Sequence, residues 1–179
     1  MPRSVWDRLL GDRGERSRAS RYVVALLEEP APGDAEWLSA HAAAGDLDHA
    51  RWELRYARRA MGLLAAERDA LDDRTASVVS AALTRAMDRD PLVAPDRREI
   101  AWRQFNTRLS AYGDALAERG GSESTTLRLG RVLLGFAGSF APMPQDLATA
   151  GTLVTGYLAG ASDALRAAFG TAELPAELR

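Results

Sequence analysis

The 179-residue sequence contains no cysteine and no lysine. The absence of cysteine excludes disulfide bonds, thiol catalysis and thiolate-bound metals. The absence of lysine excludes Schiff-base chemistry and a phosphate loop, which needs its lysine. Ile100 is the single isoleucine and Asn106 the single asparagine, whereas alanine, leucine, arginine and glycine are abundant. We attribute this bias to GC-rich coding and not to function.

Histidine is scarce, which restricts metal binding to His41 and His49. Asp46, His49 and Glu53 are spaced three and four residues apart, so they can share one face of a helix. A carboxylate-bridged di-metal bundle needs a second Glu-x-x-His segment, and no histidine follows His49. We therefore expect no metal and no cofactor, with Asp46 serving as a helix cap. A mononuclear site at His49, Glu53 and Asp46 is the alternative.

The charges nearly balance, since 23 basic and 25 acidic residues give a net charge of -2. This leaves no overall field to attract nucleic acid. The strongest positive stripe comprises Arg51, Arg55 and Arg58, which form a candidate anion-binding surface. No helix-turn-helix with a basic second helix accompanies it, so binding to nucleic acid is not favoured.

An acidic run occupies Glu67–Asp73. All-α pyrophosphatases place helical carboxylates around Mg²⁺, which makes a magnesium-dependent enzyme one alternative function. Such sites draw acids from two facing helices, and the sequence offers no second cluster. Arg68 and Arg74 lie among the acids and can neutralise them. The pattern therefore favours a solvated, ion-paired helix face.

Long hydrophobic runs are also lacking. Residues 132–162 carry one charge, Asp146, but Pro142 and Pro144 divide them into pieces shorter than the roughly 20 apolar residues of a membrane span. We predict two buried helices here and no span. Residues 1–22 hold six arginines and no apolar stretch long enough for a secretory signal, so we expect a cytoplasmic protein.

The abundant alanine and leucine favour helix, and no strand-like alternation bounded by turns is present. We predict an all-α, single-domain bundle of about six helices over residues 20–170. A basic, flexible N-terminal arm (1–19) precedes it and a C-terminal tail (171–179) follows. The expected helices are 20–29, 34–45, 46–88 and 96–120, then one that Ser122 or Ser124 caps and that ends at about residue 139, and a last one at 144–169. Asp34 is expected to cap the second of these.

The bundle is predicted to be built around one long helix, at about residues 46–88. Apolar or small residues recur every three or four positions from Leu47 to Ala82, which is the pattern of a helix packed along a neighbour. At 1.5 Å per residue this helix would be roughly 60 Å long. The alternative is a break at Asp72, with that residue capping a second helix.

A second apolar face on the long helix suggests an interface. It comprises Trp52, Tyr56, Leu83 and Met87. A helix that long is hard to cover with five shorter ones, so we expect part of it to pair with a second copy in a homodimer. Gly156 and Gly160, four residues apart, indicate close helix packing in the core or at a subunit contact.

One short stretch resembles a known family. Residues 43–50, with the sequence AAGDLDHA, resemble the turn between the paired helices of tetratricopeptide-like repeats. The stretch does not recur at a fixed period, so no repeat array is predicted.

The sequence therefore predicts a non-catalytic protein-interaction or scaffold module. One alternative is a regulatory bundle that binds a small molecule between the helix of Trp102 and Phe105 and the glycine-rich C-terminal helices. The other is a metal-dependent helical enzyme that uses His49 with Glu53, or the carboxylates of Glu67–Asp73.

Overall fold

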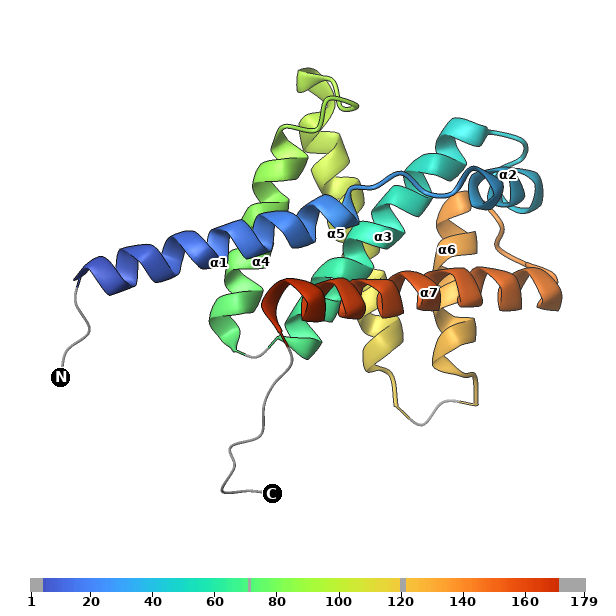
Figure 1. The fold of residues 1–179 in the computed structure, drawn as a ribbon. Helices are drawn as coiled ribbons and strands as arrows, with labels where there is room; N and C mark the ends of the chain where they lie inside the picture. The colour runs from blue at the N-terminus through green and yellow to red at the C-terminus, as the bar shows by residue number, and fades with distance from the viewer. Residues whose placement is uncertain (1–4, 71, 120–121, 171–179) are drawn as a thin grey trace.

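A computed structural model describes residues 5–70, 72–119 and 122–170, and these parts of the chain are helical (Figure 1). The predicted all-α fold is confirmed, with seven α-helices in place of about six. They are α1 (Val5–Leu26), α2 (Pro32–His41), α3 (Leu47–Asp69), α4 (Asp73–Asp88), α5 (Arg98–Ala117), α6 (Thr125–Ala137) and α7 (Pro144–Phe169). A 3-10 turn, η1 (Pro95–Arg97), leads into α5.

The prediction of one long helix at residues 46–88 is wrong. The structure shows the alternative, a break at Asp72. Helix α3 ends at Asp69 and α4 begins at Asp73. Asp72 has extended backbone angles, and its side chain accepts a hydrogen bond from the Thr75 amide at 2.7 Å. This bond satisfies a free N–H group at the start of α4, so the cap begins a new helix where the apolar pattern alone would continue the old one.

The first helix starts earlier than expected. Helix α1 begins at Val5, not at Ser20, so residues 5–19 of the predicted arm are helical. Ala19 is buried, and Glu15 forms an ion pair of 2.7 Å with Arg74 of α4. Contacts with α4 therefore extend the helix beyond the segment that its sequence pattern indicated. Residues 1–4 and the tail 171–179 lie outside the described residues.

Helix α3 is the centre of the bundle and contacts α7, α5, α2, α6, α4 and α1. Leu54, Ala57 and Met61 are buried on one of its faces. Tyr56 is buried on another face, against Phe105 of α5. A helix that is apolar on two faces needs cover on both, and α5 and α7 supply it.

Helices α6 and α7 pack so closely that their backbones touch. A Cβ atom on Gly130 would lie 2.6 Å from the amide nitrogen of Gly151, and one on Gly151 would lie 2.9 Å from the carbonyl carbon of Thr126. Both separations are too short for a real side chain, so this crossing requires glycine at both positions. In Figure 1, α7 crosses α6 at this contact.

The two helices predicted between residues 132 and 162 are the end of α6 and most of α7, but α7 is buried on only part of its surface. Neither of them, nor any other helix in the described residues, combines the length and the apolar character that crossing a membrane requires.

The α6–α7 crossing generates a first prediction. Gly151→Ala should lower the free energy of unfolding by about 1–3 kcal/mol, because the new methyl group overlaps the α6 backbone. The control is Gly156→Ala on the same helix, where a Cβ meets no atom within 4 Å. This variant should gain up to about 1 kcal/mol from helix propensity. Urea denaturation measures the free energy of unfolding of both variants. Equal changes in the two would contradict the close α6–α7 backbone contact at Gly151.

Candidate functional site

The candidate metal ligands of α3 are occupied by other interactions. Glu53 is 3% exposed, and both of its carboxylate oxygens accept hydrogen bonds from Arg108 of α5, at 2.5 and 2.9 Å. The Nε2 atom of His49 lies 3.1 Å from the carbonyl oxygen of Phe136. Asp46 caps α3 by accepting from the His49 amide at 2.9 Å.

His49 and Glu53 do share a face, with Nδ1 and Oε1 3.9 Å apart. The Arg108 guanidinium group bonds to Glu53 and lies over the ring of Phe136, the residue whose carbonyl oxygen His49 contacts. Within the described ranges no cluster of three or more His, Asp or Glu residues could hold a metal ion.

The acidic run has separate structural roles. Asp69 ends α3 and accepts hydrogen bonds from Arg68 at 2.6 Å and from Ser162 of α7 at 2.6 Å. The Arg68 bond, followed by that of Ser162, lowers the pKa of Asp69 to about 2. Asp72 caps α4, while Glu67 and Asp73 are exposed. The four carboxylates therefore do not converge on one point.

The arginine stripe is compensated by acids. Arg55 pairs with Glu29 at 2.7 Å, and Arg58 pairs with Glu28 at 2.7 Å. Arg51 pairs with Asp48 of its own helix at 3.3 Å. The first two pairs fasten α3 to the segment after α1, so this surface carries little free positive charge.

Three of the four expected interface residues are buried within the chain. Tyr56, Leu83 and Met87 belong to the core, because α5 covers Tyr56 and α1 packs along α4. These three side chains are therefore not free to form the expected contact with a second copy. Trp52 is half-buried under Arg55, whose guanidinium carbon lies 4.8 Å from the ring centroid.

A groove follows an open part of the α7 surface. It consists of three adjoining hollows of about 600, 340 and 270 Å³, and neighbouring hollows share lining residues. Its walls come from α2 at one end and from α1 at the other. Along α7 the small residues of the floor recur every four positions: Ala148, Thr152, Gly156, Gly160, Ala164 and Ala168. The Gly156 and Gly160 spacing was the one sign of this groove in the sequence.

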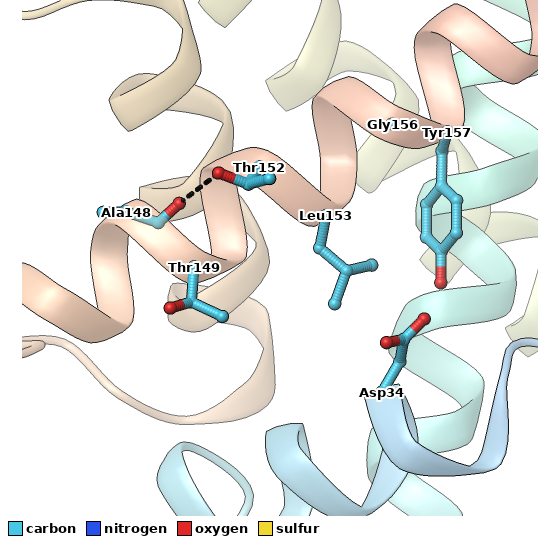
Figure 2. A pocket seen from close by; sticks show the side chains of 7 residues that line it. All are labelled: Asp34, Ala148, Thr149, Thr152, Leu153, Gly156 and Tyr157. Atoms are coloured by element: carbon cyan, nitrogen blue, oxygen red, sulfur yellow. Dashed lines mark hydrogen bonds between the residues drawn. The ribbon is translucent and has the colours of Figure 1, made fainter.

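Asp34 and Tyr157 face each other at the α2 end of the groove (Figure 2). Asp34 is not the expected cap, because Pro32 begins α2 and Ala31 occupies the cap position. Its carboxylate makes no hydrogen bond or ion pair with the part of the chain that the structure describes. The hydroxyl of Tyr157 is buried and also lacks a hydrogen-bond partner there. Burial, followed by the charge of Asp34, raises the pKa of Tyr157 far above its ordinary value.

A second apolar hollow, of about 490 Å³, lies between α5 and α6. This is the region where a ligand pocket was expected, but its lining does not include Trp102 or Phe105. It is formed by Ala111, Arg131, Val132, Gly135, Phe136 and Phe140. Phe105 instead packs in the core against Tyr56.

Comparison of the chain with protein-family models, with curated proteins and with solved structures gives no match in any of the three. The function of this chain is therefore inferred from its own grooves and charges.

Two buried tyrosine hydroxyl groups, those of Tyr157 and Tyr22, give a second prediction. Tyr157→Phe should leave the free energy of unfolding unchanged or raise it by up to about 1 kcal/mol, because the hydroxyl that it removes has no partner. Tyr22→Phe should lower it by about 1 kcal/mol, since the Tyr22 hydroxyl donates to the Gly62 carbonyl at 2.7 Å. Chemical denaturation compares the two, and a loss in both would show that Tyr157 has a partner.

The third prediction concerns Asp69. A carboxyl group with a lowered pKa stabilises the folded chain above its unfolded-state pKa, and this contribution is lost as the pH falls from about 4 to about 2. Thermal melts across this range should show wild type losing stability more steeply than Asp69→Asn. Glu67→Gln, an exposed change on the same helix, is the control and should keep the wild-type slope. Equal slopes for wild type and Asp69→Asn would count against the assignment.

Proposed function

We propose that the chain is a non-catalytic protein-interaction module that receives an α-helix of a partner protein in the groove along α7. The observation that carries this proposal is the continuous groove with a floor of small residues at four-residue spacing. Residues at this spacing form one ridge of a helix surface. When the ridge is small, a second helix can approach closely.

The glycines in the groove support an external partner. Glycine in a helix costs roughly 0.5–1 kcal/mol relative to alanine. The α6–α7 contact accounts for Gly130 and Gly151, because a side chain at either position would overlap backbone. At Gly156 and Gly160 a Cβ would meet no atom within 4 Å. Packing within the chain therefore gives no reason for glycine there, whereas a docked helix does.

The dimensions also suit a helix. The ends of the groove floor, Ala148 and Ala168, lie 20 positions apart on α7, which corresponds to about 30 Å. Binding of an amphipathic helix in an apolar groove is a common mode of peptide recognition. Small-molecule sites are usually shorter and more enclosed than this open groove.

The charges at the ends of the groove define the partner further. Asp34 is the uncompensated carboxylate at the α2 end, and Arg21, at the α1 end, is exposed and makes no ion pair with the described residues. Between them Glu28 and Arg58 compensate each other. A complementary helix carries a basic residue near Asp34 and an acidic residue near Arg21, which would also fix its direction.

The proposal places this module in the cytoplasm. The sequence holds no cysteine, and proteins of reducing compartments rarely depend on disulfides. The proposed function does not involve nucleic acid, because Arg51, Arg55 and Arg58, the strongest positive stripe of the sequence, are paired with acids.

The test is selection from a displayed library of helix-forming peptides against the purified protein. We expect enriched peptides to bear small residues four apart and a basic residue at one end. Gly156→Leu combined with Gly160→Leu should weaken their binding at least tenfold, because the leucine side chains would project into the groove from positions where a Cβ meets no atom within 4 Å. Fluorescence anisotropy measures the affinities.

Gly14→Leu on α1 is the matched control. Its Cβ also meets no atom within 4 Å, and Gly14 does not line the groove, so binding should be unchanged. Peptides that bind the double variant as well as wild type would refute the groove as the binding site. Failure to enrich any helical peptide would refute the proposed function itself.

A further inference from the structure

The connection between α6 and α7 exposes an aromatic side chain. Phe140 is 87% exposed, and Met143 in the same connection is also exposed. An aromatic ring in water leaves a large favourable contribution of burial unused. Phe140 is the most exposed of the large hydrophobic residues with described side chains, so its position calls for a physical explanation.

Hydrogen bonds fix the backbone just before Phe140. Gly138 ends α6 with a φ of +112°, a left-handed conformation that glycine adopts without strain. The Ser139 amide donates to the Leu134 carbonyl at 2.8 Å, and the Gly138 amide donates to the Gly135 carbonyl at 3.2 Å. This cap fixes the direction in which the chain leaves α6, immediately before Phe140.

The apolar α5–α6 hollow lies directly beside this exposed ring. Its volume of about 490 Å³ can hold a phenyl group, and the exposed Phe140 is itself one of the residues that line it. Gly135 lines the hollow, and a Cβ on Gly135 would meet no atom within 4 Å. Arg131, at the rim, pairs with Glu123 at 2.5 Å and so offers a compensated guanidinium group beside the opening.

We propose that two copies of this chain form a two-fold dimer in which Phe140 of each copy inserts into the α5–α6 hollow of the other. A two-fold interface uses the same patch on both copies, so the patch must carry both the protruding group and the cavity that receives it. Phe140 and the hollow satisfy this requirement side by side. The inserted ring also comes near Arg131, in a position suited to a cation–π contact.

This surface is separate from the groove along α7, because the two share no lining residue. The dimer is therefore independent of the proposed helix docking. It differs from the interface expected at Trp52, Tyr56, Leu83 and Met87, of which only Trp52 reaches the surface.

Sedimentation velocity over a wide concentration range tests the dimer. We expect a weak self-association, with a dissociation constant on the order of micromolar, because the patch is small. Phe140→Ser and Gly135→Leu should each weaken it at least tenfold, the first by removing the protruding ring and the second by filling the hollow. Val24→Ser on α1, another change at an exposed large hydrophobic residue, is the control and should leave dimerisation unchanged.

A mixture of the two variants gives the sharper result. Phe140→Ser keeps the other five residues that line the hollow and Gly135→Leu keeps the ring, so a mixed dimer regains one of the two insertions. The mixture should therefore contain more dimer than the two samples measured separately. A monomeric wild type at several hundred micromolar, a dimer that survives Phe140→Ser, or a mixture with no added dimer would each overturn the proposal. Circular dichroism checks that every variant is folded.

Discussion

The backbone contact between α6 and α7 is the constraint on which both proposed surfaces depend. Gly130 and Gly151 let the two helices touch, which turns one face of α7 inward along its length. Another part of the α7 surface lies open and forms the floor of the groove. Beyond this crossing, the left-handed Gly138 ends α6 and sets where the connection with Phe140 leaves the bundle. A side chain at either glycine would separate the helices and displace both surfaces.

Arginine–acid pairs are the second organising feature, and they explain why the catalytic alternatives find little support. Glu53 and Arg108 join α3 to α5 through a buried, bidentate ion pair. Arg59 and Asp90 form a second buried ion pair, with a single hydrogen bond of 2.7 Å. A buried carboxylate without such a partner would be costly, so each must be compensated where it lies. Arginine suits this role, because its planar group can satisfy both carboxylate oxygens at once.

Together the two surfaces describe a simple scaffold. A dimer formed through Phe140 would present two α7 grooves, and each groove could hold one partner helix. A partner with two such helices would then bind the second one as an intramolecular event, at a higher effective concentration. The charges of Asp34 and Arg21 at opposite ends of each groove would give both helices the same direction relative to α7.

The sequence by itself determined the features that depend on a few neighbouring residues. These are the helical class, the division of the C-terminal segment by Pro142 and Pro144, and the capacity of Asp72 to begin a helix. Only the tertiary structure decided which face of α7 is covered and that Glu53 pairs with Arg108, 55 residues away. Caps and propensities act within one or two turns, whereas the partner of a buried charge and the open face of a helix depend on how distant helices pack.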